Sequence, residues 1–291
     1  MEMPLSSPSA SSTPSAPGAD FAPREVMLTG LGEREIPARL IDVGQGRPVV
    51  FLHGLVGLND HWEEVARRIA HRVRCILLEI PLLTLSGRDC SVDGVEALTV
   101  RFLDQHLAGD RAPVLVGNSF GGHVALRIAL DRPDLAGGLV LAGASGLIEK
   151  TMMADVQIHP SREWLRRKIG ELFYDPSKHM READLDRAHK ELSQKTGARA
   201  MVKLARSARK DHLGSRVPDI AAPTLLIWGR NDIVTPPEAA EQFMGSLPDA
   251  RIVWFDECGH TPMIEKPADF ARAMLEFTDE LQRRARGGGG A

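Results

Sequence analysis

One pentapeptide of this 291-residue chain has the spacing of a nucleophilic serine. Ser119 stands between Gly117 and Gly121, at the end of the apolar run Val114–Val116 and directly before a run that favours a helix. A strand, a sharp turn and a helix hold such a serine in a strained conformation, and glycine fits best on either side of it. The backbone N–H of Phe120 would face a developing oxyanion. Because ordinary strand-to-helix turns also contain glycines, the pentapeptide alone leaves both interpretations open.

A nucleophilic serine needs a base, and the base needs a carboxylate that orients it. Asp232 follows the run Leu225–Trp228, and His260 follows the run Arg251–Phe255. Catalytic groups collect at the carboxyl ends of the strands in an open α/β sheet, so these two side chains can converge on Ser119. Alone, Asp232 would be a turn carboxylate and His260 a surface-loop histidine. Together, and in this order along the chain, the three residues predict a Ser-His-Asp triad.

The elements that must position these groups alternate between strands and helices. We expect strands over residues 26–28, 36–43, 48–52, 74–80, 114–118, 138–142, 223–228 and 251–255. The first two are expected to pair antiparallel, and the later ones are mainly apolar, as strands buried on both faces are. The sequence therefore predicts an α/β fold with a mostly parallel eight-stranded sheet flanked by helices.

An inserted block interrupts this alternation. Residues 145–218 contain three helical patterns and no convincing strand, which predicts a helical cap between two parts of the core, 23–144 and 219–286. The Ser/Pro/Ala-rich residues 1–22 are expected to form a disordered tail, and residues 287–291 a flexible end.

Charge is distributed unevenly over the chain. Residues 145–217 contain 16 Lys and Arg against 10 Asp and Glu, whereas the whole chain has a net charge of −3. A basic cap would raise the local concentration of an anionic substrate. For any single one of these residues, a solvated charge on the outer face of a helix is the more common role.

Composition excludes several classes of protein. The net charge of −3 excludes a globally basic nucleic-acid binder. No apolar run reaches the roughly 18 residues that span a bilayer, so we expect a cytoplasmic protein without a membrane partner. The three scattered cysteines and ten histidines show no disulfide framework or metal-ligand spacing, and no metal or cofactor is implied. Cys258 stands near His260 but is not at the turn between a strand and a helix that presents a nucleophile, which disfavours a cysteine nucleophile.

Taken together, these pieces resemble the α/β-hydrolase superfamily over about residues 26–286. The matching motifs are His53-Gly54, Gly117-Asn118-Ser119-Phe120-Gly121-Gly122, Gly229-Arg230-Asn231-Asp232 and Gly259-His260. The resemblance implies an oxyanion hole made by the backbone N–H groups of Leu55 and Phe120, and a buried, loop-holding role for His53. One departure is the segment Glu79–Gly87, where relatives often carry Asp-x-Pro-Gly-x-Gly, so the shape of the pocket is open.

Within the superfamily, the chain is most similar to the hydrolases that cleave the carbon–carbon bond of meta-cleavage products, the vinylogous 1,5-diketones of aromatic ring fission. Asn118 stands where those enzymes have an Asn before the nucleophile, and Trp62 has the spacing of their tryptophan. Arg187 falls where they keep a cap arginine for the substrate carboxylate or enolate. The resemblance therefore implies that Asn118, Trp62 and Arg187 bind substrate. Glu64 and Thr261 depart from the pattern, which has Asn and Trp at these positions.

Three functions of different classes fit this sequence. The first is a serine hydrolase that acts on an ester or a carbon–carbon bond of a small, partly apolar molecule, which is either neutral or anionic. The second is an acyltransferase that passes the same acyl group to an acceptor other than water, and the third is a non-catalytic binding module. An intact triad argues against the third. Asn118 and Arg187 favour a dienol-carboxylate substrate, because a simple alkyl ester requires neither. A homo-oligomer is compatible with the sequence.

Overall fold

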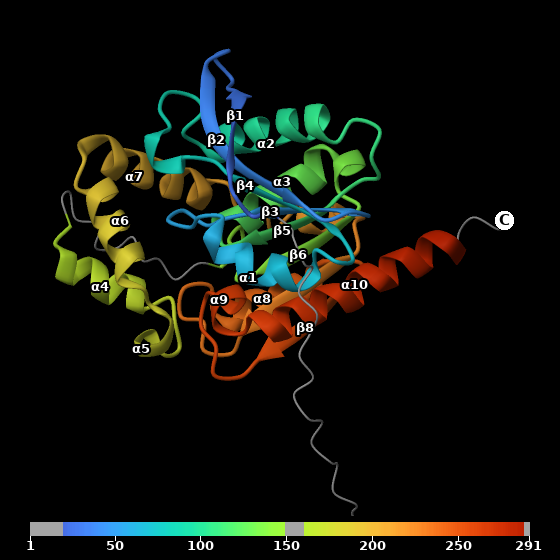
Figure 1. Ribbon diagram of the computed structural model, residues 1–291. Coiled ribbons are helices and arrows are strands. Elements are labelled where there is room, and N and C mark those ends of the chain that lie inside the picture. Colours follow the sequence, from blue (N-terminus) through green and yellow to red (C-terminus); the bar gives the residue numbers. More distant parts are fainter. Residues whose placement is uncertain (1–19, 149–159, 288–291) are drawn as a thin grey trace, which may run out of the picture.

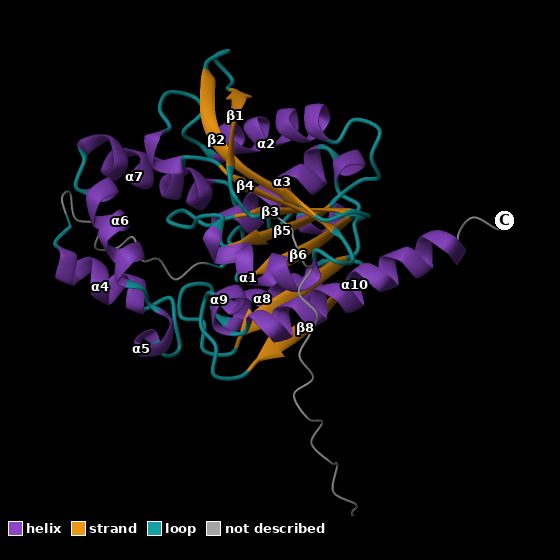
Figure 2. Cartoon of the chain, viewed as in Figure 1, coloured by secondary structure: helices purple, strands orange, loops and turns teal. Residues whose placement is uncertain are grey.

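A computed structural model of the protein describes residues 20–148 and 160–287. Its centre is an eight-stranded sheet, whose place between the helices can be followed in Figures 1 and 2. The strands are β1 (Arg24–Thr29), β2 (Glu35–Val43), β3 (Pro48–Leu52), β4 (Arg74–Glu79), β5 (Val114–Asn118), β6 (Gly138–Ala142), β7 (Thr224–Gly229) and β8 (Ala250–Phe255). Their order in the sheet is β1-β2-β4-β3-β5-β6-β7-β8. Only β2 runs antiparallel to its neighbours β1 and β4 among these strands. The predicted α/β fold with a mostly parallel sheet is confirmed.

Helices cover both faces of the sheet, which places β5 in a fully buried position. The helices of the core are α1 (Asp60–Ile69), α2 (Val92–His106), α3 (Phe120–Asp131), α8 (Pro237–Ser246), α9 (Pro262–Glu265) and α10 (Pro267–Gly287). Alternate residues of β3 point to opposite faces. Val50 packs in the apolar core that contains α2 and α3, whereas Phe51 packs in the core that contains α1 and α10. Burial on both faces explains why the central strands are apolar throughout.

The described residues between β6 and β7 form four α-helices, which we call the helical insertion. They are α4 (Arg162–Gly170), α5 (Pro176–His179), α6 (Glu182–Leu192) and α7 (Lys195–Lys210), and they gather at one side of the sheet (Figure 1). Leu165 and Leu185 form the insertion's own apolar core together with Leu83, which follows the carboxyl end of β4. The insertion is therefore docked on the edge of the sheet where parallel strands end. The four-residue helices α5 and α9 were not predicted, since they are too short to show a helical period.

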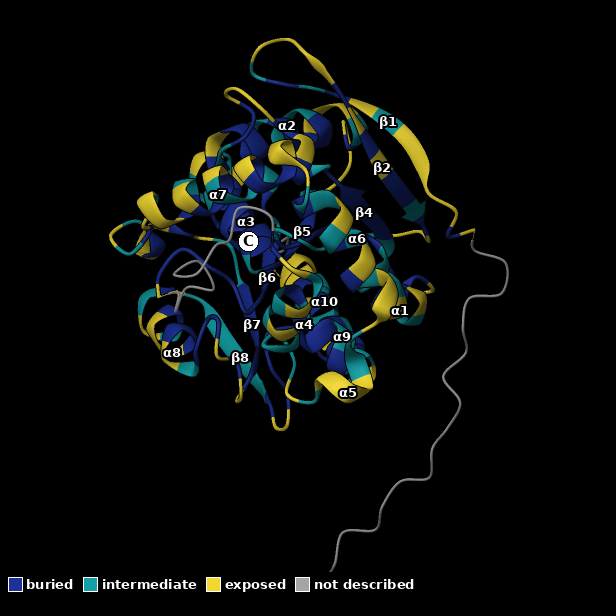
Figure 3. Ribbon diagram, turned by 90° about the vertical axis from the view of Figure 1, so that its left-hand side faces the viewer, coloured by how far each residue is buried: buried dark blue, intermediate teal, exposed yellow. Residues whose placement is uncertain are grey.

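The part of the chain before β1 differs from the expected disordered tail at one residue, Phe21. Residues 1–19 and 288–291, and residues 149–159 of the expected cap, lie outside the described residues. Phe21, however, is buried, and the guanidinium of Arg67 lies 4.0 Å from its ring centre. The expected disordered tail over residues 1–22 is thus wrong at Phe21, because an aromatic ring gains more from burial than ordering it costs. Figure 3 shows the central strands buried beneath partly exposed helices, whereas β1 at the edge of the sheet is largely exposed. No helix in the described ranges is long and apolar enough to span a bilayer.

Candidate active site

Ser119 lies on the sharp turn between β5 and α3. Its φ of 53° falls in the left-handed region, which is strained for a residue other than glycine. At Gly121, a Cβ atom would come within 2.2 Å of the carbonyl oxygen of Leu52, so the start of α3 packs directly on the end of β3. Phe120 is the first residue of α3, where an N–H group has no partner within the helix. The turn therefore presents both a serine and a free backbone donor next to the loop after β3.

His260 and Asp232 form a buried pair at the ends of β8 and β7. Nδ1 of His260 lies 2.9 Å from Oδ2 of Asp232, and the side chains are 4% and 0% exposed. The other carboxylate oxygen, Oδ1, accepts the N–H groups of Val234 at 2.8 Å and Thr235 at 3.0 Å. The carboxylate is therefore fixed, and it favours the imidazole tautomer with its proton on Nδ1. That tautomer leaves Nε2 to act as a general base.

Two residues that support this pair were missed in the sequence. The hydroxyl oxygen of Thr235 lies 2.9 Å from Oδ2 of Asp232 and 3.0 Å from the carbonyl oxygen of Gly143. Gly143 has a φ of +52°, and a Cβ there would lie 2.9 Å from Nδ1 of His260. The Asp-x-x-Thr spacing after β7 is a sequence signal for the turn, because an Asp side chain often accepts backbone N–H groups two and three residues later.

Ser119 and His260 line one cavity of about 100 Å³ between the core and the helical insertion. The core contributes the loop after β3, α1, the turn at Ser119 (the serine turn), the loop after β7 that carries Asp232 (the acid loop) and the loop after β8 that carries His260 (the histidine loop). The insertion contributes Leu172 and two residues of α7. The lining residues are Gly54, Leu55, Val56, Gly57, His61, Asn118, Ser119, Leu172, Met201, Ala205, Val234, His260 and Thr261. Most of this wall is apolar. Among the described residues that line it, none is Lys or Arg.

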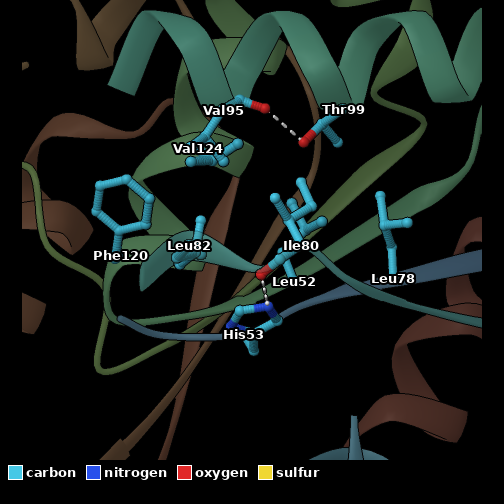
Figure 4. A pocket seen from close by; sticks show the side chains of 10 residues that line it. Leu52, His53, Leu78, Ile80, Leu82, Val95, Thr99, Phe120 and Val124 are labelled. Atoms are coloured by element: carbon cyan, nitrogen blue, oxygen red, sulfur yellow. Dashed lines mark hydrogen bonds between the residues drawn. The ribbon is translucent and has the colours of Figure 1, made fainter. Parts of the chain in front are cut away.

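The loop Gly54–Gly57, which we call the oxyanion loop, forms one wall of the cavity. The N–H of Gly57 donates to the carbonyl of Gly54 at 3.0 Å, and a Cβ on Gly54 would lie 3.5 Å from Cβ of Ser119. His53 is buried, with Nδ1 2.8 Å from the carbonyl oxygen of Gly54 and Nε2 3.1 Å from that of Ile80 (Figure 4). His53 thus holds this loop, as predicted. Within the described part of the chain, the N–H of Leu55 donates to no protein group, which leaves it available to a ligand.

The segment Glu79–Gly87, where the chain departs from its relatives, contacts both the start of α1 and the helical insertion. Glu79 is buried, and its carboxylate accepts the N–H of Asn59 at 3.0 Å and lies 3.3 Å from Nη1 of Arg39. Asn59 directly precedes α1, so Glu79 fixes the far end of the connection between the oxyanion loop and that helix. Leu83 then packs into the core of the helical insertion.

Asn118 lines the cavity and also ties three elements together. Its amide nitrogen donates to the carbonyl of Ala142 at 2.9 Å and to the carbonyl of His260 at 3.0 Å. Both N–H bonds of the side chain are therefore engaged within the protein. Asn118 supports the position of the histidine loop, and a substrate could meet only its oxygen.

Trp62 does not reach the cavity, and the expectation that it binds substrate is wrong. Its side chain is fully buried, with ring centres 5.3 Å from Phe51 and 5.7 Å from Phe270. The buried residues of α1 are Trp62, Val65, Ala66 and Ile69, a spacing that puts all four on one helix face. That spacing was the available signal, because it places Trp62 in the core and the preceding His61 on the cavity side.

Arg187 is also not among the residues that line the cavity. Its Nη2 donates to the carbonyl of Val56 in the oxyanion loop at 3.1 Å, and the side chain is 20% exposed. The guanidinium therefore reaches the active-site region but is engaged there by the protein backbone.

Glu265, on α9, connects the helical insertion to the histidine loop by hydrogen bonds. Its role was not predicted from the sequence. One carboxylate oxygen of buried Glu265 accepts the N–H of Gly259 at 2.9 Å, and the other accepts the N–H of Tyr174 at 2.8 Å. The N–H of His260 donates to the carbonyl of Leu172 at 2.8 Å. The segment between α4 and α5 is thus hydrogen-bonded to the backbone of His260 and to Glu265, which in turn holds Gly259. A lone glutamate beyond the histidine gave no signal, since its partner Tyr174 comes from a distant part of the chain.

Cys258 is fully buried, as are both other cysteines. Burial, together with the nearby carboxylate of Glu265, raises the pKa of the Cys258 thiol well above its usual range. A thiol that stays protonated is a poor nucleophile. Ser119 therefore remains the candidate nucleophile of this site.

Comparison with known proteins finds relatives that are named as hydrolases. A relative from Pseudomonas putida, 2-hydroxy-6-oxononadienedioate/2-hydroxy-6-oxononatrienedioate hydrolase 2, is 29% identical over 84% of this chain and 93% of its own length. The pimeloyl-[acyl-carrier protein] methyl ester esterase of Nitrosomonas europaea is 28% identical over 78% of this chain and 94% of its own.

A solved structure is similar over most of both chains. It is that of MGS-MChE2, an alpha/beta hydrolase enzyme from the metagenome of lagoon sediments of Mar Chica, Morocco, with 29% identity, a TM-score of 0.68 and coverage of 84% of this chain and 95% of that one. Residues 49–273 match the alpha/beta hydrolase family, and this stretch holds the serine turn, the acid loop and the histidine loop. The chain therefore belongs to the alpha/beta hydrolase family and is a hydrolase.

Proposed function

We propose that the protein is a serine hydrolase in which Ser119, His260 and Asp232 form the catalytic triad. The observation that carries this proposal is the buried contact of 2.9 Å between His260 and Asp232, in a site where His260 and Ser119 line the same cavity. The strained φ of 53° at Ser119 supports it, because such strain is kept where a side chain must be presented for chemistry.

In the proposed reaction, Oγ of Ser119 attacks the substrate carbonyl while Nε2 of His260 takes the hydroxyl proton. Asp232 stabilises the imidazolium that forms. The N–H groups of Leu55 and Phe120 donate to the oxyanion. His260 returns the proton to the leaving group, and water releases the acyl group by the reverse sequence. In carbon–carbon bond cleavage, His260 and Ser119 would also move the proton that turns the dienol into its keto form.

The substrate is proposed to be small and largely apolar, because the described wall of the cavity is mainly aliphatic. The Pseudomonas putida relative is named for a dienedioate, which supports hydrolysis of a carbon–carbon bond in a ring-fission dienoate. The Nitrosomonas europaea relative is named for a methyl ester, which supports ester hydrolysis. The helical insertion would act as a cap that keeps water from the reacting groups.

The triad is tested with Ser119→Ala. We expect kcat to fall by about three orders of magnitude or more, as it does when a triad member is lost, while thermal unfolding stays near that of the unaltered protein. A fluorophosphonate probe should label the unaltered protein and not the variant. Labelling that persists in Ser119→Ala would place the nucleophile elsewhere.

The bond cleaved is tested with 4-nitrophenyl esters of graded chain length beside a 2-hydroxy-6-oxo-dienoate. Cleavage of the dienoate would assign carbon–carbon hydrolysis, whereas rapid ester turnover without it would assign a carboxylesterase. Products formed in the presence of added alcohols or thiols separate a hydrolase from an acyltransferase. Absence of any Ser119-dependent turnover or labelling would leave only a binding module.

A further inference from the structure

Helix α6 of the insertion contacts the oxyanion loop through Arg187. The guanidinium Nη2 donates to the carbonyl of Val56 at 3.1 Å. Val56 directly follows Leu55, whose N–H is the expected oxyanion donor. The contact therefore restrains the backbone next to the atom that would stabilise the transition state.

Acidic neighbours hold Arg187 in this orientation. Its Nη2 lies 3.8 Å from Oδ1 of Asp184, and its Nη1 lies 3.7 Å from Oε2 of Glu191. Burial acts to raise the pKa of Asp184, but His61 and Arg181 outweigh it and bring that pKa to about 2, so the carboxylate stays charged. A guanidinium between two carboxylates has its charge already balanced, which weakens its attraction for a third.

Two further contacts fasten α6 along the segment that follows the oxyanion loop. Nη2 of Arg181 lies 2.8 Å from Oδ2 of Asp60, and Oδ2 of Asp184 lies 3.8 Å from Nε2 of His61. In Figure 3, α6 lies beside α1, as these contacts require. The oxyanion loop is thus restrained by His53 from the core and by Arg187 from the insertion.

We propose that Arg187 is a positioning residue that fixes the oxyanion loop for catalysis, and that it is not the group that binds a substrate carboxylate. This inference rests on the proposed function, because it concerns the same oxyanion. It gives the insertion a second task besides covering the cavity, since docking of α6 then sets the geometry of the oxyanion hole. Loss of Arg187 weakens transition-state stabilisation equally for neutral and anionic substrates, whereas loss of a carboxylate-binding residue affects only the anionic ones.

The test compares Arg187→Ala, Arg187→Lys and a control, Arg166→Ala. Arg166 lies on α4 of the same insertion and pairs with Glu182, so its loss removes the same charge without touching the oxyanion loop. The substrates are 4-nitrophenyl butyrate and the 4-nitrophenyl monoester of glutaric acid, which differ mainly by a remote carboxylate. Arg187→Ala should lower kcat for both esters by the same factor, about 10-fold to 100-fold, with little change in KM.

Arg187→Lys should recover part of this loss, because a lysine ammonium can donate one hydrogen bond to the carbonyl of Val56. Arg166→Ala should turn over both esters like the unaltered protein. Amide hydrogen exchange gives a second measurement that does not depend on activity. Exchange across Gly54–Gly57 should be faster in Arg187→Ala and unchanged in Arg166→Ala.

A rise in KM for the glutarate monoester alone, with an unchanged kcat for the butyrate, would overturn the inference and make Arg187 a substrate-binding residue. Failure of the unaltered protein to hydrolyse either ester in a Ser119-dependent way would instead contradict the proposed function. The exchange measurement then decides about Arg187 by itself, since unchanged exchange across the oxyanion loop would overturn the positioning role.

Discussion

Replacing Glu265 with Gln keeps the size of the side chain and removes one of its two acceptors. The carboxylate accepts the N–H of Gly259 at 2.9 Å and that of Tyr174 at 2.8 Å, through different oxygens. A glutamine amide has one oxygen, so one backbone N–H must face its NH₂ group instead. Leaving one buried donor unsatisfied costs about 1 to 3 kcal/mol. For a domain of this size, a loss of about 2 kcal/mol lowers the unfolding temperature by roughly 3 to 4 °C.

The catalytic effect of Glu265→Gln should accompany the loss of stability. Glu265 holds the backbone of Gly259, the residue before His260. A shift of this loop would therefore misplace the imidazole. A small misplacement of a catalytic group can cost about 100-fold in rate. We therefore expect kcat for a 4-nitrophenyl ester to fall while KM changes less.

The assay is thermal unfolding followed by circular dichroism, with kcat and KM measured well below the transition. Glu276→Gln is the matched control, because Glu276 is exposed on α10 and undergoes the same chemical change. If Glu265→Gln melted with the control and kept its kcat, the bridge between the insertion and the histidine loop would carry neither stability nor alignment, and the reasoning would be refuted.

Two further predictions test the packing and the charges of the core. Trp62→Ala should lower the free energy of unfolding by about 3 to 5 kcal/mol, as large-to-small changes in a core do, which urea unfolding measures. Trp62→Phe should leave KM for an ester unchanged, because the side chain does not line the cavity. A raised KM in Trp62→Phe would show that this residue contacts the substrate. Burial raises the pKa of Glu96 to about 7, and the nearby carboxylate of Asp131 adds to this despite Arg127. As the pH rises, the unfolded chain loses this proton before the folded protein does, so the contribution of Glu96 to stability declines from about pH 4.5 to about pH 7. The unfolding temperature of Glu96→Gln should therefore fall less over this interval than that of the unaltered protein. An equal fall in both proteins would exclude Glu96 as its source.

The sequence by itself determined the fold and the candidate triad, because both follow from local constraints. Alternation of apolar strands with amphipathic helices specifies a covered parallel sheet, whatever the distant contacts are. The glycines around Ser119 reflect the shape of one tight turn. Asp232 and His260 could be chosen because each lies in the loop that follows a strand, and the ends of parallel strands meet at one edge of the sheet.

Only the tertiary structure decided what the supporting residues do. Trp62 and His61 are neighbours in the chain, yet the turn of α1 points one into the core and the other towards the cavity. Arg187 has the sequence position of a substrate-binding arginine, but the docking of α6 places its guanidinium on the carbonyl of Val56. The partners of Glu265 lie in the loops before α5 and before α9. Such roles depend on how segments far apart in the chain pack against one another, and no local pattern of residues encodes that packing.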